Sequence, residues 1–231
     1  MNKTSEIQLN THLKSVPLFS NLSDRQLDIL YKAGAIQRFE KNCIIVNQND
    51  SGDTFYIVVS GSVRVTLLNE NGSEIVLSLL KEGDFFGELS LLDNEPRSAS
   101  VITMEDVTLF LLTRRQFYQL IITYPDILRK VLKEICCRLR NADEKIGSLA
   151  FLDVYGRTIR VLQQLAHEQG TKTRNGIEIL HAPTHQELSS LVGTSRETVT
   201  RILKVLKENR NLISYKGRKL ILREYANKPP L

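Results

Sequence analysis

Short apolar segments separated by turn residues fill the stretch from residue 39 to residue 113, and they constrain the fold more than any other feature. The segments are rich in β-branched and aromatic residues, which favour strands, and they cover residues 43–46, 55–59, 63–68, 75–80 and 107–112. Asn71-Gly72 stands between two of them and is a strong hairpin signal, because both residues tolerate a positive φ. Strands at this spacing predict an antiparallel sandwich or jelly roll.

The stretch before these strands has a different character. Residues 1–38 are polar and are expected to be helical, with a break at Pro17 and with Ser23 as a helix N-cap. The chain of 231 residues has 42% hydrophobic and 25% charged residues, which is typical of a globular protein of one large or two modest domains. We expect four parts: an N-terminal helical segment (1–38), a β-roll (39–123), a long helix (124–150) and a C-terminal domain (151–231).

The long helix opens at Pro125-Asp126 and carries a narrow apolar seam. Its apolar positions follow one another in steps of four and three residues: Leu128, Leu132, Ile135, Leu139, Ala142, Ile146 and Leu149. This spacing is the a/d repeat of a coiled coil, whereas a helix that lies on its own domain usually has a wider apolar stripe. We therefore expect the helix to join two copies in a parallel dimer, with packing on its own domain as the alternative.

The C-terminal domain is the basic part of the chain. Residues 151–231 hold 14 Lys and Arg against 7 Asp and Glu, while residues 1–150 hold 17 against 19. A basic domain joined to a slightly acidic one favours a polyanion as the partner of the former. A solvated basic face is the alternative.

A helix-turn-helix pattern lies within this basic domain. Thr184 and Glu187 form a capping box that opens an apolar run, Gly193 supplies a tight turn, and Ser195 caps a second helix. Arg196, in the first turn of that second helix, can read guanine, and the glutamate beside it can accept from cytosine N4. The remaining elements expected here are a helix over 152–168, a strand over 177–180 and a hairpin wing over 212–215 and 220–222, whose basic tip would contact phosphate.

The segment FGELSLLDNEPRSA (86–99) concentrates residues suited to an anionic ligand. The planar donor fork of Arg97 fits a phosphate, and backbone N–H groups beside small residues such as Gly87 add further donors. Glu88 would repel a phosphate, but it can accept hydrogen bonds from sugar hydroxyls. The combination indicates a ligand with a single phosphate joined to a ribose, and an ordinary loop with a surface arginine is the alternative.

This segment resembles the phosphate-binding cassette of cyclic-nucleotide-binding domains. With EKIGSLAFLD (144–153) and SRETVTRILK (195–204), the likeness covers most of residues 35–225 and is greatest to the CRP/FNR family of bacterial transcription regulators, in its catabolite activator branch. The resemblance implies an α+β fold: an N-terminal β jelly-roll that binds a cyclic nucleotide, a long dimerisation helix and a C-terminal winged helix-turn-helix. It also implies a regulator rather than an enzyme, a homodimer that binds palindromic double-stranded DNA, and contact with RNA polymerase.

The resemblance assigns roles to individual residues. The expected ligand-binding residues are Gly87, Glu88, Leu89, Arg97, Ser98, Ala99, Ala142 and Asp143. The expected base-reading residues are Arg196, Glu197 and Arg201, on half-sites of the TGTGA type. The expected phosphate-contacting residues are Thr184, Gln186, Ser195 and Thr198.

Ala142-Asp143 departs from the family pattern, because the catabolite activator branch has Thr-Ser at these positions, which touch adenine from both subunits. A carboxylate can accept from the adenine amino group, and it can also pair with N1–H and the amino group of guanine. We therefore take cAMP as the first candidate and keep cGMP, another effector or no effector as alternatives. Asp143 as a solvated helix residue is a further alternative.

Other classes find less support in the sequence. No apolar run approaches a membrane span and the N-terminus has no secretory h-region, so we expect a cytoplasmic protein. None of the four histidines falls in the β-rich stretch and the three cysteines form no iron–sulfur ligand set, so neither metal nor haem is expected. A cyclic-nucleotide-responsive regulatory subunit without DNA binding is disfavoured by the helix-turn-helix.

Overall fold

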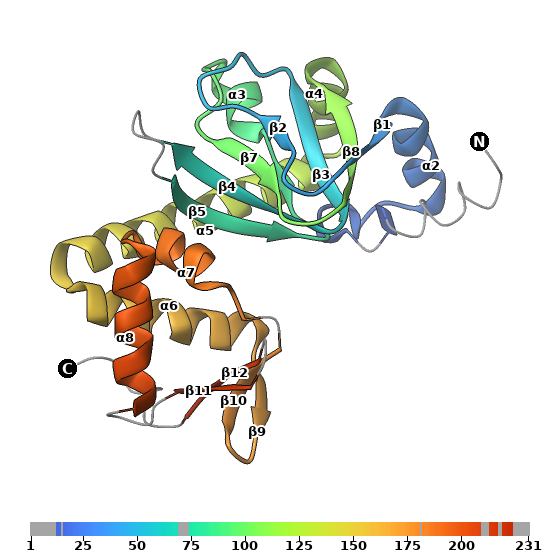
Figure 1. Cartoon of the computed structure of the whole chain (residues 1–231). Helices are drawn as coiled ribbons and strands as arrows, with labels where there is room; N and C mark the ends of the chain where they lie inside the picture. Colours follow the sequence, from blue (N-terminus) through green and yellow to red (C-terminus); the bar gives the residue numbers. More distant parts are fainter. Residues whose placement is uncertain are drawn as a thin grey trace. The chain divides into compact units, whose positions relative to one another are not determined.

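The computed structural model describes residues 13–14, 16–68, 74–180, 182–208, 213–216 and 219–223. The chain forms two compact units, Met1–Arg140 and Asn141–Leu231 (Figure 1). The Asn71-Gly72 turn and residues 217–218 of the wing tip lie outside the described residues. None of the described helices is long and apolar enough to cross a membrane.

The first unit is built on two four-stranded antiparallel sheets, with strand orders β1-β8-β3-β6 and β2-β7-β4-β5 (Figure 1). The strands are β1 (Ala35–Phe39), β2 (Ile44–Val46), β3 (Thr54–Ser60), β4 (Ser62–Leu68), β5 (Glu74–Lys81), β6 (Phe85–Phe86), β7 (Ser100–Thr103) and β8 (Val107–Thr113). The expected antiparallel β domain is therefore confirmed.

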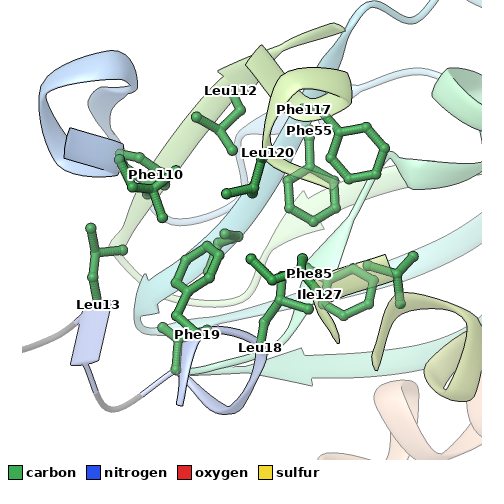
Figure 2. Packing of buried hydrophobic residues seen from close by; sticks show 14 of the residues in the cluster. Leu13, Leu18, Phe19, Phe55, Phe85, Phe110, Leu112, Phe117, Leu120 and Ile127 are labelled. Atoms are coloured by element: carbon green, nitrogen blue, oxygen red, sulfur yellow. The ribbon is translucent and has the colours of Figure 1, made fainter. Parts of the chain in front are cut away.

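Aromatic side chains fill the centre of this unit. Phe55 of β3 packs on Phe117 with ring centroids 4.7 Å apart and on Phe85 at 5.4 Å. Phe110 and Leu112 of β8 are fully buried in the same cluster, as Figure 2 shows. Burying each such side chain stabilises the fold by roughly 1.5–3 kcal/mol, so this cluster anchors the sheet whose β6 leads into the candidate site.

The N-terminal segment is only partly helical. A 3₁₀ turn, η1 (Pro17–Phe19), precedes α2 (Asp24–Ala33), and Ser23 caps α2 through a capping box with Gln26, as expected. The expectation of helix up to residue 38 is wrong, because β1 begins at Ala35 and pairs with β8. β1 is an edge strand with only two half-buried residues, so its sequence lacks the apolar alternation by which strands are recognised.

Three further helices lie wholly or partly in the first unit: α3 (Glu88–Asp93), α4 (Arg114–Thr123) and α5 (Pro125–Phe151). The first unit ends at Arg140, within α5. The seam of α5 divides into two sets. Leu128 and Ile135 are partly buried against the core of their own unit, as the alternative interpretation expects for these two positions. The dimer interpretation stays a prediction. The other large members are exposed in the single chain: Leu132, Leu139, Ile146 and Leu149.

The second unit contains α6 (Val154–Gln169), α7 (His185–Val192), α8 (Arg196–Glu208) and a sheet of order β11-β12-β10-β9 (Figure 1). Its strands are β9 (Thr171–Thr173), β10 (Gly176–Ile179), β11 (Ile213–Lys216) and β12 (Lys219–Leu222). The expected hairpin is present as β11 and β12. Lys219 at its tip forms an ion pair with Glu178, at 2.7 Å, and the expected phosphate contact of the basic tip stays a prediction.

Candidate ligand site and nucleic-acid interface

Gly87 shapes the start of the cassette. It follows β6 directly and has φ +84°, a left-handed conformation that favours glycine. A Cβ at this position would lie 2.6 Å from Nη1 of Arg97 and 2.8 Å from the carbonyl oxygen of Thr54. The glycine therefore allows the backbone to approach the arginine closely.

Arg97 is buried, with 5% of its surface exposed. Its Nη1 donates to the carbonyl of Gly87 at 2.9 Å and its Nη2 donates to that of Thr54 at 2.8 Å. Its guanidinium carbon lies 5.7 Å from the ring centroid of Tyr56. Burial lowers the pKa of Arg97, with Tyr56 and Asp53 acting in the opposite direction. Among the described residues, these two carbonyls use two of the five N–H donors of the guanidinium, so the group still has donors for a phosphate.

Glu88 is the first residue of α3 and only 2% of its surface is exposed. Its Oε1 accepts a hydrogen bond from Nη1 of Arg138 at 3.1 Å, while its Oε2 is buried without a hydrogen-bond partner among the described residues. Burial raises the pKa of Glu88, and the charge of Arg138 opposes that shift. A buried acceptor without a partner is costly, and a ligand hydroxyl would satisfy it.

Arg138 of α5 is a site residue that the sequence analysis did not identify. Besides Glu88, it donates to the carbonyl of Phe85 at 2.7 Å and to Glu134 at 3.2 Å. Its guanidinium carbon lies 5.0 Å from the ring centroid of Phe85. The contact with Glu88 joins residues 50 positions apart in the chain, so no local sequence pattern predicts it.

Arg114 supports the cassette from the other end of α3. It donates to the carbonyls of Ser90 at 3.0 Å and Leu91 at 3.1 Å and to Oδ1 of Asn94 at 2.6 Å, near the C-terminus of the short helix. It also donates to the carbonyl of Gly52 at 2.9 Å. A cation that binds the last carbonyls of a helix stabilises it, so Arg114 holds α3 in place.

The structure thus brings together Gly87, Glu88 and Arg97 of the expected ligand residues. Ser98 and Leu89 are exposed beside them, and Ala99 is buried. Ala142 and Asp143 are exposed residues of α5 that fall in the second unit, and their role is taken up below as a proposal. Within the described part of the chain, no group of three His, Cys, Asp or Glu side chains could hold a metal ion.

The helix-turn-helix forms as expected. Thr184 and Glu187 make the capping box of α7, and Gly193 ends α7 with φ +72°. Arg157 of α6 donates to the carbonyl of Val192 at 3.2 Å, and it thereby ties the turn to the body of the unit. Val199 of α8 is fully buried, and so the opposite face of that helix is turned to solvent.

The exposed face of α8 carries the expected base-reading residues Arg196, Glu197 and Arg201. Hydrogen bonds from its own backbone N–H and from the Ser195 hydroxyl lower the pKa of the Glu197 carboxyl. Arg196 and Arg201 are both exposed, and a guanidinium group is the donor that reads guanine in a major groove.

The expected phosphate contacts lie at the two helix N-termini. Thr184 is the exposed N-cap of α7, and Gln186 is exposed in its first turn. Ser195 is also exposed, and its Oγ lies 3.0 Å from Oγ1 of Thr198 and accepts from the Thr198 N–H at 3.2 Å. Helix N-termini attract anions, so the placement suits phosphate binding.

Two family models match the chain. Residues 36–124 match the cyclic nucleotide-binding domain, and residues 156–226 match the Crp-like helix-turn-helix domain. Fold and site together therefore define a DNA-binding transcription regulator with a cyclic-nucleotide-binding domain, and not an enzyme.

Curated relatives match over most of their length. The chain is 39% identical over 189 residues (81% of this chain, 89% of the relative) to the cAMP-activated global transcriptional regulator CRP of Salmonella typhimurium. It is 35% identical over 196 residues (85% and 88%) to the cyclic AMP receptor protein of Thermus thermophilus. The chain belongs to the CRP/FNR family.

Solved structures with this fold include a regulator with a different effector. The c-di-GMP-responsive regulator CLP of Xanthomonas campestris has a TM-score of 0.75 and 28% identity, with 85% of this chain and 97% of that chain covered. A mutant of CooA from Carboxydothermus hydrogenoformans has a TM-score of 0.76 and 27% identity, with 85% and 86% covered. The fold is therefore shared among regulators that respond to different molecules.

Proposed function

We propose that this protein is a homodimeric transcription regulator that binds cAMP and then binds palindromic operators in double-stranded DNA. The observation that carries the ligand assignment is the pairing of a buried Arg97, with donors to spare, and a buried Glu88, whose Oε2 has no partner among the described residues. The arginine suits a cyclic phosphate and the carboxylate suits a ribose hydroxyl. The relatives named for cAMP favour adenine as the base.

Ala142 and Asp143 are proposed to contact the base. This chain has Ala142-Asp143 where the catabolite activator branch has a Thr-Ser pair, so only the carboxylate of Asp143 could form side-chain hydrogen bonds with the base. Asp143 can accept from the adenine amino group, or it can pair with two donors of guanine, which makes cGMP the second candidate.

The exposed seam of α5 is proposed to hold the dimer. Leu132, Leu139 and Ile146 are 49%, 62% and 64% exposed in the single chain. Three large apolar side chains in one line on a helix are costly in water, and a second copy of the same helix would cover them. A dimer of this kind presents two copies of α8, and their separation must be near one DNA turn, about 34 Å, for both half-sites to be read.

Gating is proposed to follow from differential affinity. The ligand can shift the dimer only as far as it binds one arrangement better than the other. Contact of the base with α5 would link occupancy to the dimer helices, and these would set the spacing of the recognition helices. Arg196, Glu197 and Arg201 would read bases, while Thr184, Gln186, Ser195 and Thr198 would bind phosphates. We also propose that the regulator works in the cytoplasm, where it contacts RNA polymerase.

Calorimetric titration of the ligand-free protein with cAMP and, separately, with cGMP tests the ligand assignment. We expect tight binding of cAMP, weaker binding of cGMP, and loss of both in Arg97→Leu. The reverse order of affinities would make cGMP the effector, and Asp143→Ser should then restore the preference for cAMP. Binding of neither nucleotide, or full binding by Arg97→Leu, would refute the assignment.

Fluorescence anisotropy tests the DNA-binding role. Arg201→Ala should weaken binding to a selected operator more than to random DNA, with about 1–3 kcal/mol of lost discrimination. Thr198→Ala should weaken both to a similar extent, because phosphate contacts carry no sequence information. Equal losses on both DNAs for Arg201→Ala would refute its base-reading role.

A further inference from the structure

Two adjacent cysteines, Cys136 and Cys137, lie in the part of α5 that belongs to the first unit. In the described part of the chain both are free thiols, and both are exposed. Successive residues of a helix point about 100° apart, so the two thiols face different directions although they are neighbours in the sequence. The two positions therefore differ in what they can meet.

Cys136 points away from its own unit and lies beside the exposed seam. Ile127 and Val131 of α5 are buried in the core of the first unit, and Cys136 points about 160° from their mean direction at 3.6 residues per turn. Four positions before it and three after it stand Leu132 and Leu139, which are 49% and 62% exposed. Residues three and four apart lie on one helix face, so Leu132, Cys136 and Leu139 form one exposed apolar surface.

Cys137 lies outside this surface. It points about 130° from the mean direction of Leu132, Cys136 and Leu139. The residues three and four positions from it in the helix are all polar or charged: Lys133, Glu134, Arg140 and Asn141. A second helix that covers Leu132 and Leu139 would therefore leave Cys137 in water.

We propose that Cys136 forms a disulfide with Cys136 of a second copy of the chain, and that this bond is a redox-controlled lock on the dimer. The proposal rests on the proposed function, that is, on dimerisation through the exposed seam of α5. In a parallel pair of helices related by a two-fold axis, a residue near the axis faces its own copy. One suitably placed cysteine in each chain is then sufficient for a bond between the subunits.

The expected spacing at Cys136 fits a disulfide. Helices pack with their axes about 8–10 Å apart, and their Cα atoms lie about 2.3 Å from each axis. Cys136 points about 30° from the centre of the surface it forms with the two leucines, which places the Cα atoms of the two copies roughly 4.5–6.5 Å apart. Disulfides join Cα atoms about 4.4–6.8 Å apart. The same geometry places the two copies of Cys137 roughly 11–13 Å apart, which is too far.

Thiol–disulfide exchange with a low-molecular-weight disulfide, RSSR, forms the bond. The Cys136 thiolate of one copy attacks RSSR, so that a mixed disulfide Cys136–SR forms and RSH is released. The Cys136 thiolate of the second copy then attacks the Cys136 sulfur of the mixed disulfide, which forms the bond between the subunits and releases a second RSH. The two cysteines are oxidised to one disulfide, and RSSR is reduced to two RSH.

Packing without chemistry is the competing role of Cys136, because a free cysteine in an apolar contact often serves only as a small hydrophobe. Alanine at this position would then serve equally well under all redox conditions. The two roles differ in one measurable respect, since only a disulfide prevents the dimer from dissociating on dilution.

The experiment uses the full chain without nucleotide, with oxidised glutathione as the probe disulfide. After incubation, free thiols are blocked with N-ethylmaleimide and the chains are separated on a denaturing gel without reductant. We expect a dimer band in wild type that disappears when dithiothreitol is added. Cys136→Ser should lose the band, whereas Cys137→Ser, the matched control one position away, should keep it.

Further measurements separate a specific bond from chance collisions. Thiols paired within a preformed dimer have a high effective concentration, so the cross-linked fraction should not fall on dilution while the dimer persists. Leu139→Glu, which is expected to break the dimer, should lose the band although Cys136 is intact. In sedimentation velocity at low protein concentration, oxidised wild type should remain dimeric and oxidised Cys136→Ala should dissociate.

The outcomes distinguish the lock from the dimer itself. A dimer under reducing conditions that forms no cross-link with glutathione disulfide, or that cross-links equally in Cys136→Ser, overturns the assignment of Cys136 and leaves the proposed function intact. A protein that is monomeric under reducing conditions at all concentrations overturns the proposed dimer and this inference with it.

Discussion

Replacing Arg138 by methionine removes the cation that is bonded to a nearly inaccessible carboxylate. The side chain of Glu88 is 3% exposed and that of Arg138 is 26% exposed, with 3.1 Å between Nη1 and Oε1. Removal of one partner from a buried pair costs about 3–5 kcal/mol, because the remaining charge stays in a medium of low polarity. Because the arginine is partly exposed, the expected loss is about 3 kcal/mol, at the lower end of this range.

Hydrogen exchange of the ligand-free full chain measures this loss where it occurs. Peptides from β3 and β8 report opening of the first unit, and the change in their protection converts to the free energy of unfolding. The control is Glu134→Gln, which removes an i,i+4 partner of Arg138 that is 41% exposed. We expect that control to cost less than about 0.5 kcal/mol.

The pH dependence of the stability loss in Arg138→Met tests whether the Glu88 carboxylate causes that loss. Burial raises the pKa of Glu88 in the folded state above its ordinary value, so the folded state binds this proton more tightly than the unfolded state. The resulting stability is present below the ordinary pKa and is lost as the pH rises through the raised pKa. Arg138→Met raises that pKa further, so its cost should be greatest at neutral pH and should shrink as the solution is acidified.

A double-mutant cycle with Glu88→Gln completes the test. The double variant should lose at least about 1 kcal/mol less than the sum of the two single losses. Additive losses, or an Arg138→Met variant within about 0.5 kcal/mol of wild type at neutral pH, would refute the view that this pair is a coupled buried unit.

Three further changes have expected outcomes. Gly87→Ala places a Cβ 2.6 Å from Nη1 of Arg97, so calorimetry should show at least about tenfold weaker nucleotide binding, equal to about 1.4 kcal/mol; unchanged affinity would contradict the cassette geometry. Leu139→Glu puts two like charges into the proposed seam and should yield monomers in sedimentation velocity; a stable dimer would place the interface elsewhere. Thr184→Ala removes the N-cap of α7 and should cost the second unit about 1 kcal/mol in thermal unfolding, and a smaller loss in Thr184→Ser would confirm the capping role.

The sequence predicted those parts of the fold that local patterns determine. The apolar segments that became β3, β4 and β8 alternate or cluster over five to seven residues, and the capping box of α7 occupies four consecutive positions. Gly87, Glu88 and Arg97 could be predicted as ligand residues for the same reason, since the cassette is contiguous in the chain, and their role in binding stays a prediction.

Elements that depend on distant partners were missed. β1 is stabilised by pairing with β8, more than 65 positions away, and the apolar and polar residues of its own sequence do not alternate. α4 opens with a capping box between Thr113 and Gln116, and this signal could have identified it, but it directly follows an apolar strand. Arg138 looks like an ordinary polar helix residue until the fold brings α3 against α5.

The seam of α5 shows how one pattern can serve two purposes. Apolar residues in alternating steps of four and three fit a coiled coil, and they also fit a helix that buries part of its apolar stripe against its own domain. The two cases are hard to tell apart because 3.5 residues per turn (coiled coil) and 3.6 (straight helix) differ little over two turns. Leu128 and Ile135 lie beside the aromatic core, so there the stripe packs inward. Farther along, Leu139 and Ile146 have no such neighbour and remain exposed.

The two hydrogen bonds that hold Arg97 also affect how much side-chain entropy is lost when a ligand binds. A free arginine side chain has about 2 kcal/mol of rotamer entropy, and here the bonds to Gly87 and Thr54 remove that freedom when the chain folds. In the proposed function, a phosphate would meet a donor fork whose orientation is already set, so its binding energy would not be spent on ordering the side chain. Lysine at this position could not do the same, because a single ammonium cannot hold both carbonyls and keep a planar fork for the phosphate.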